Sequence, residues 1–204
     1  MQNEVTTLEY AVTQWVPEHF IGGHPALDLA NAVFDRRVPV PGNELLGSAG
    51  DIGSWLLAAG LASARGARAV AAIEVEPFVA RVHAVREAAA QLFGSIVAGR
   101  TPDAQALGVL LATAGSGLCT SAIRLDDMRP RLTLARWQDP DAVTALLALL
   151  AVEAFYTLPR DRLRSCPRCA WLFLDTSRGG KRRWCSMQVC GNREKVSRHR
   201  EQLR

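Results

Sequence analysis

Four of the five cysteines lie close together near the end of the 204-residue chain, where they form two pairs. Two residues separate Cys166 from Cys169, four separate Cys185 from Cys190, and fifteen separate the two pairs. Four thiolates at this spacing are typical of proteins that enclose one tetrahedral zinc ion. Such a site is structural rather than catalytic, because four protein ligands leave no coordination position for water.

Two alternatives to a four-cysteine zinc site stay open. The cysteine pairs could form a redox-sensitive dithiol switch, and His199 could replace one thiolate as a ligand. We favour zinc because the first nine residues contain two glutamates and no basic segment typical of a secretory signal. A cytoplasmic chain keeps its cysteines reduced and available to a metal. The sequence therefore predicts one structural Zn²⁺ as the cofactor.

Basic residues are concentrated beside these cysteines. Residues 160–204 carry thirteen Lys and Arg against four Asp and Glu, a net charge of +9, whereas the preceding 159 residues carry a net charge of −5. A basic module on an acidic body is the charge distribution of a polyanion binder. The alternatives are a solvated face and a protein-docking module. The candidate nucleic-acid-binding residues are Lys181, Arg182, Arg183, Arg193, Lys195, Arg198, Arg200 and Arg204.

The residues around the cysteines predict a zinc-ribbon or treble-clef-like finger over 160–204. Cys166-Pro-Arg-Cys169 has the form of a zinc knuckle, a tight turn that lets two thiolates face one ion. An alternating strand at 171–174 should pair with 181–184 across a reversal at Gly179-Gly180. This hairpin would bring Cys185 back beside the knuckle.

A final helix is expected to begin near Cys190, with Asn192 contributing to its N-terminal cap. Val189, Val196 and Leu203 recur every seven residues, so we expect this stripe to pack on the zinc core. The basic side chains would then lie on exposed faces, where they could follow phosphates or enter a groove.

The upstream residues 20–158 predict a mainly α-helical domain with a small β-hairpin. Hydrophobic residues make up 49% of the chain, and alanine and leucine, which favour helices, dominate. The expected helices cover about 25–34, Asp51 (as the cap) to Ala59, 76–98, 103–114 (ending at Gly115 to Gly117) and 139–158. The hairpin is expected over 121–125 and 131–137, with a turn at 126–130. Cys119, just before it, is expected to be buried. Pro159 marks the domain boundary, and the absence of a linker suggests rigid coupling.

Three polar residues, His24, Asp28 and Asn31, lie beside the apolar stripe of the first helix. Capping or buried hydrogen bonding is the favoured interpretation. The alternative is a site for a small effector ligand.

The sequence argues against a membrane protein and against an enzyme. The most apolar run, 142–156, contains Glu153 and is shorter than the roughly twenty residues that span a bilayer. We expect it to be a buried core helix. No nucleophile, base and orienting group occur at a recognisable spacing, so no catalytic residue is predicted. The expected location is the cytoplasm, and a homodimer is expected if a single finger reads a sequence.

Several motifs resemble a known bacterial architecture. Trp171-Leu-Phe-Leu-Asp-Thr-Ser177, Arg183-Trp-Cys-Ser-Met187 and Cys190-Gly-Asn-Arg193 resemble the CGNR zinc-finger family. Gly23 and Leu27-Asp-Leu-Ala-Asn31 are similar to the helical ABATE domain that precedes this finger in candidate stress-induced transcription regulators. The resemblance implies that Cys166, Cys169, Cys185 and Cys190 bind zinc and that the finger has a DNA-binding role, so DNA is favoured over RNA as the partner. The helical domain is expected to sense a ligand or to mediate oligomerisation.

Overall fold

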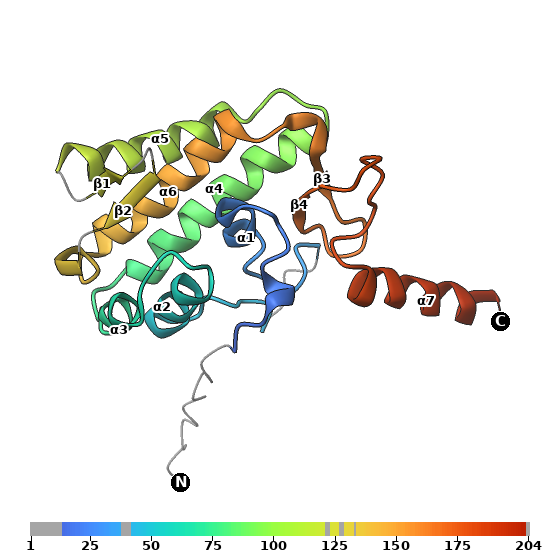
Figure 1. The fold of residues 1–204 in the computed structure, drawn as a ribbon, viewed down its shortest axis with the longest axis horizontal. Helices are drawn as coiled ribbons and strands as arrows, with labels where there is room; N and C mark the ends of the chain where they lie inside the picture. The colour runs from blue at the N-terminus through green and yellow to red at the C-terminus, as the bar shows by residue number, and fades with distance from the viewer. Residues whose placement is uncertain (1–13, 38–41, 121–122, 127–128, 133, 203–204) are drawn as a thin grey trace, which may run out of the picture.

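A layer of helices carries a small finger at one end, and the last helix extends from the finger away from the rest (Figure 1). The computed structural model describes residues 14–37, 42–120, 123–126, 129–132 and 134–202. The helices are α1 (Pro25–Ala30), α2 (Ala49–Ala58), α3 (Ala64–Ala71), α4 (Phe78–Val97), α5 (Ala104–Cys119), α6 (Pro140–Thr157) and α7 (Asn192–Gln202). The strands are β1 (Ile123–Asp126), β2 (Arg129–Leu132), β3 (Leu163–Ser165) and β4 (Leu172–Leu174). Short 3-10 helices cover 17–19, 134–136 and 160–162, and a π-helical turn covers 187–191.

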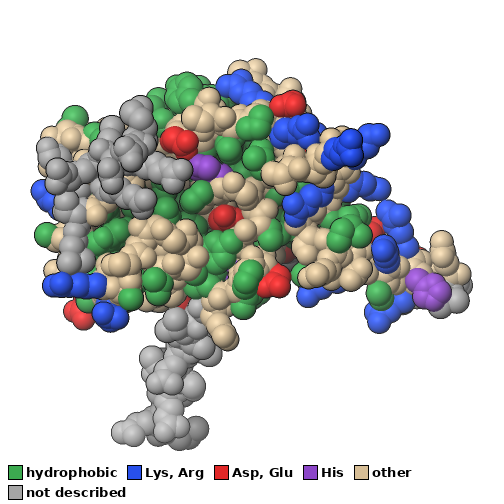
Figure 2. Space-filling model, in the orientation of Figure 1, with side chains coloured by type: hydrophobic (Ala, Val, Ile, Leu, Met, Phe, Trp, Pro, Cys, Tyr) green, Lys and Arg blue, Asp and Glu red, His purple; other side chains and the backbone are tan. Residues whose placement is uncertain are grey.

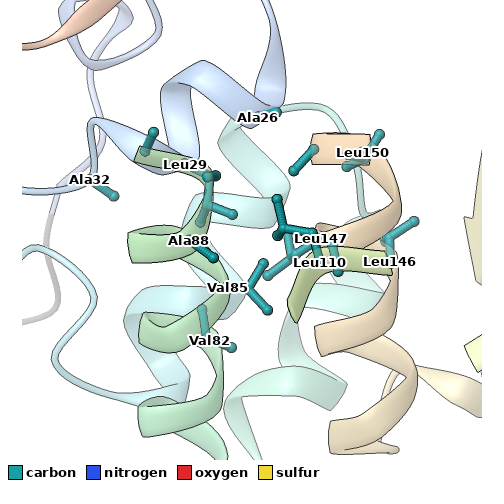
Figure 3. Packing of buried hydrophobic residues seen from close by; sticks show 14 of the residues in the cluster. Ala26, Leu29, Ala32, Val82, Val85, Ala88, Leu110, Leu146, Leu147 and Leu150 are labelled. Atoms are coloured by element: carbon teal, nitrogen blue, oxygen red, sulfur yellow. The ribbon is translucent and has the colours of Figure 1, made fainter. Parts of the chain in front are cut away.

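The main core lies between α4, α5 and α6, which run side by side (Figure 1). Val85 of α4, Leu110 of α5 and Leu147 of α6 converge near its centre (Figure 3), and each is at most 2% exposed. Burying side chains of this size stabilises the fold by about 1.5–3 kcal/mol each. Hydrophobic burial therefore holds the helical domain together.

Helix α6 is the one described helix long and apolar enough to cross a membrane, with a mean hydropathy of 1.3 over 18 residues. However, 61% of that stretch is buried inside the protein. It is the core helix that its sequence predicts, and it begins after the cap residue Asp139, whose side chain accepts the N–H groups of Asp141 and Ala142.

Helix α5 continues through Gly115 and Gly117 to Cys119, so the expected end at these glycines is wrong. Gly117 is explained by packing, because a Cβ there would lie 2.4 Å from the Cβ of Ala145 in α6. Cys119 is exposed rather than buried, which corrects a second expectation. It lies two residues beyond the buried Gly117, about 200° further around the helix.

The first helices also differ from the prediction at their ends. Helix α1 stops at Ala30, four residues early, and the chain then forms a bridge between Val33 and Glu44. Ser48 caps α2 by accepting the N–H of Asp51, so Asp51 lies in the first turn and is not the cap. Helix α3, which the sequence analysis missed, is capped by Ser63.

Strands β1 and β2 form the expected hairpin, paired from Ile123 with Leu132 to Asp126 with Arg129. The turn is shorter than the predicted one, and the chain enters a 3-10 helix at 134–136 where a strand was expected. Residues 121, 122, 127, 128 and 133 of the predicted hairpin lie outside the described residues.

Candidate metal centre

Four cysteine sulfur atoms, from Cys166, Cys169, Cys185 and Cys190, all lie within 4.8 Å of one another. Three of the distances are 3.6 Å from Cys169 to Cys185, 3.5 Å from Cys185 to Cys190 and 3.7 Å from Cys190 to Cys169. A tetrahedral zinc ion with Zn–S bonds of about 2.3 Å separates its ligand sulfur atoms by about 3.8 Å. The four residues therefore fit one structural Zn²⁺.

Three of the four crowded thiols resist ionisation, whereas the fourth, Cys166, ionises more readily. Hydrogen bonding to Cys166 raises the pKa of Cys169 to about 12, and hydrogen bonds to Cys166 and Cys169 also raise the pKa of Cys185. Burial raises the pKa of Cys190, whereas hydrogen bonds from Cys169 and Cys185 lower the pKa of Cys166. Bound Zn²⁺ would hold all four sulfur atoms as thiolates, because its positive charge offsets the repulsion between neighbouring thiolates and lets their protons leave.

The knuckle is built on a strand pair that differs from the predicted one. Strand β4 pairs antiparallel with β3, upstream of the knuckle, rather than with 181–184. The turn closes when Cys166 donates its N–H to Trp171 O and accepts the N–H of Ala170, both at 2.8 Å. Ala170 has a φ of 57°, a left-handed conformation that reverses the chain. The predicted hairpin was wrong because residues 181–184 form no strand, and Arg182 donates its N–H to the Asp175 side chain instead of to a strand partner.

The two faces of β4 serve the two parts of the molecule. Phe173 is fully buried and packs with the cysteines, together with Trp171 just before the strand. Leu172, on the opposite face, belongs to the helical core. The alternating pattern at 171–174 thus places one strand between the zinc centre and the helical body.

The loop after β4 is held by the buried carboxylate of Asp175. Its oxygens accept the backbone N–H groups of Ser177 at 2.9 Å and Arg182 at 2.8 Å. The hydrogen bonds from Ser177 are the main reason that the pKa of Asp175 lies below its ordinary value. Asp175 was not among the predicted site residues, although Asp followed two residues later by a serine N–H is the signature of an Asx turn.

Arg182 faces inward, which separates it from the other candidate nucleic-acid contacts. Its guanidinium donates to the backbone oxygens of Trp184 and Cys185 and lies 4.7 Å from the centre of the Phe173 ring. These contacts support the return of the chain to Cys185.

Asn31 joins the helical body to the finger. Its side-chain amide donates to Leu172 O and accepts from Leu172 N, both at 2.7 Å. The Trp171 indole donates to Val33 O at 2.8 Å, and Leu174 N donates to Gly22 O at 2.8 Å. Rigid coupling between the two parts follows from this set of buried hydrogen bonds.

His24 and Asp28 also have partners inside the chain. His24 caps α1 by accepting the Ala26 N–H, and its other ring nitrogen lies 2.8 Å from Glu153. Asp28 accepts the Gly22 N–H at 2.7 Å, and burial raises its pKa to about 7. These contacts match the hydrogen-bonding interpretation of His24, Asp28 and Asn31, and they give the ligand interpretation no support.

Helix α7 follows the zinc centre through the π-helical turn that contains Cys190. Ser186 caps this turn by accepting the Val189 N–H, so the cap is not Asn192. The predicted packing stripe is also wrong: Val189 touches the cysteine cluster, but Val196 is 50% exposed. No side chain of α7 is buried, because the helix extends beyond the finger (Figure 1). Leu203 lies outside the described residues.

The basic side chains gather over the finger and α7 (Figure 2). Lys181, Arg183, Arg193, Lys195, Arg198 and Arg200 are exposed, whereas Arg204 lies outside the described residues. Glu194 bridges Arg198 at 3.1 Å and Arg168 of the knuckle at 3.4 Å. This bridge ties the first turn of α7 to the zinc site.

Comparison with protein families matches both parts of the chain. Residues 23–159 match the ABATE model, described as a "putative stress-induced transcription regulator", and residues 162–202 match the CGNR zinc finger. Among curated proteins, none matches this sequence. The first match covers more than half of the chain, and the cysteine geometry agrees with the second. The protein therefore belongs to the ABATE family and carries a CGNR zinc finger.

Proposed function

We propose that this protein regulates transcription by binding DNA through α7 and the basic loop before Cys185. The observation that carries the proposal is the placement of α7. It starts at the zinc centre, buries none of its side chains and extends away from the helical body (Figure 1). A helix held at one end, with no side chain buried, is suited to lie against another molecule.

The chemistry of α7 favours a polyanionic partner. Arg193, Lys195 and Arg200 are exposed and form no ion pair among the described residues. Lys181 and Arg183 extend this charge onto the neighbouring loop. Their charges are free to neutralise phosphates, whereas Arg182 and Arg198 already have partners within the finger.

The shape of α7 favours DNA over RNA. Its eleven residues give a rod about 16 Å long. The major groove of B-form DNA, about 12 Å wide, admits such a helix, whereas the major groove of A-form RNA is too narrow. A cytoplasmic location fits reduced zinc-binding cysteines. A zinc ion held by four cysteines has no coordination position left for water, so this centre is proposed as structural and not catalytic.

Salt dependence tests the proposal. A fluorescent mixed-sequence duplex is titrated with zinc-loaded protein at several salt concentrations, followed by fluorescence anisotropy. The slope of log K against log salt should change by about 0.9 for each lost phosphate contact. The triple variant Arg193→Gln, Lys195→Gln, Arg200→Gln should therefore flatten the slope by up to about 3.

The matched control removes three exposed arginines from the helical body, Arg65→Gln, Arg68→Gln and Arg100→Gln. Both triple variants change the net charge equally, so only the α7 variant should flatten the slope. Equal slopes for the two variants contradict a specific role for α7. Absence of binding at low salt by the zinc-loaded protein favours the other class of function, a zinc-stabilised protein-interaction adaptor.

A further inference from the structure

A cavity of about 390 Å³ lies where the finger meets the helical body. Its walls include Phe34 from the segment after α1 and Trp171 and Val189 from the finger. Three of the four metal-binding cysteines, Cys169, Cys185 and Cys190, line it, whereas Cys166 does not. A small molecule can therefore approach the zinc centre from this side.

The four cysteines differ in their exposure to solvent. Cys169 is 8% and Cys190 is 6% exposed, compared with 2% for Cys185 and 1% for Cys166. The sulfur atoms of Cys169 and Cys190 lie 3.7 Å apart. The two most accessible thiolates are thus neighbours, and each can reach the other after a small movement.

The charge at the cavity supports thiolate chemistry. Arg37, Arg168 and Arg193 line it, together with two acidic residues, Glu18 and Asp35. Among these, Arg37 pairs with Asp35, whereas Arg193 forms no ion pair among the described residues. Cationic guanidinium groups at the cavity stabilise the hydroxide that leaves when the O–O bond of a peroxide breaks.

We propose that the zinc centre is a peroxide-reactive modification site in which Cys169 and Cys190 are the reacting pair. The Cys169 thiolate attacks one peroxide oxygen, the O–O bond breaks, and a sulfenic acid forms as hydroxide leaves. The Cys190 thiolate then attacks this sulfur, the S–O bond breaks, and a second hydroxide leaves as the disulfide forms. Two electrons pass from sulfur to peroxide, and two protons from solvent convert the hydroxides to water.

Zinc release follows because the ion loses two of its four ligands. Cys190 lies in the turn that leads into α7, and the other tie of α7 among the described residues is the partly exposed ion pair between Glu194 and Arg168 of the knuckle. Oxidation therefore frees the helix from its fixed orientation. This regulatory consequence rests on the proposed function, whereas the oxidation and zinc release do not.

The experiment uses the zinc-loaded full chain with Cys119→Ser, because Cys119 is exposed and would react on its own. Hydrogen peroxide is added, zinc release is followed with a chromogenic chelator, and disulfides are mapped by mass spectrometry. We expect zinc to appear in proportion to a Cys169–Cys190 disulfide. A thiol reductant plus zinc should restore the original protein.

Two valine variants test the role of the cavity. Val189→Phe should fill part of it and slow zinc release severalfold, with rates compared only between proteins that carry equal zinc before oxidation. Val196→Phe is the control, because Val196 is a half-exposed valine of α7 that does not line the cavity. Zinc retention under peroxide, a first disulfide other than Cys169–Cys190, or equal rates for the two variants overturns the proposal. None of these readouts uses nucleic acid, so this proposal and the DNA-binding proposal can fail separately.

Discussion

The helical body has a continuous hydrophobic core that draws on α1 to α6, whereas the finger's own cluster has six buried members among the described residues. Four of the six are cysteines, and the other two are Trp171 and Phe173. A core this small cannot offset the conformational entropy of forty ordered residues. The body is thus held by burial, and the finger by zinc and by its contacts with the body.

The small core of the finger also explains why α7 extends away from the rest of the protein. A helix stays on a protein surface when it buries an apolar stripe, and α7 buries none of its side chains. Val196 is left half-exposed, and the helix is tied at its start by Cys190 and by Glu194. The zinc centre therefore sets the direction of α7.

The largest effect is expected from Cys185→Ser. Structural zinc contributes about 10–16 kcal/mol to folding in fingers of this kind, and loss of one ligand removes most of it. The finger should lose its zinc and unfold, while α4, α5 and α6 keep their protection in hydrogen exchange. Cys119→Ser, the control, should change neither. Full zinc content and unchanged thermal stability in Cys185→Ser contradict the assignment of this ligand.

A second effect is a pH dependence of stability that arises in the helical body and not in the finger. Burial raises the folded-state pKa of Asp28 from 3.8 to about 7, so the folded protein favours the protonated carboxyl. This contribution to stability is fully present below about pH 4 and is lost as the pH rises to about 7, at about 1.4 kcal/mol per pKa unit. It therefore amounts to up to about 4 kcal/mol.

Asp28→Asn removes this titration while keeping an oxygen that can accept the Gly22 N–H. Denaturant unfolding should show the variant more stable than the wild-type protein at pH 8 and close to it at pH 4. The zinc site titrates equally in both proteins, so the difference isolates Asp28. A constant difference across this range means that Asp28 keeps its ordinary pKa.

A smaller effect is expected where the two parts meet. Asn31→Ala leaves the buried N–H and C=O of Leu172 without their partners, at a cost of about 1–3 kcal/mol. When thermal unfolding is monitored through the release of zinc, the finger should separate from the body at a lower temperature than in the wild-type protein. Asn43→Ala, which removes a half-buried amide outside this contact, is the control. Equal shifts in both variants rule out Asn31 as the joint.

The sequence was informative wherever local spacing decides the structure. The cysteine pattern predicted the metal site, and the alternating residues 171–174 predicted a strand with two different faces. The sequence-based predictions were wrong where a contact with another part of the chain determines the local structure. Gly117 sits inside a helix because Ala145 lies against it, and β4 pairs with β3 because the knuckle joins them.

In the candidate site, too, the predictions were wrong where contacts with other residues, and not local spacing, determine the structure. The pattern of Val189, Val196 and Leu203 predicted a packed face, but no surface exists beyond the finger for Val196 to meet. Arg182 was predicted to contact phosphates because of its charge and position, but it donates hydrogen bonds to backbone oxygens of its own finger. Residues such as Asn31 and Phe34 gain their roles only when the body and finger come together.

The central claim is that zinc orients a basic helix for DNA. The most direct test compares duplex binding by the zinc-loaded protein with binding after zinc is removed by a chelator, at one low salt concentration. Removing zinc leaves every basic side chain in place, so the affinity would stay the same if it depended on charge alone. We predict instead that affinity falls at least about tenfold, the factor that corresponds to 1.4 kcal/mol. Equal affinity before and after chelation contradicts the claim.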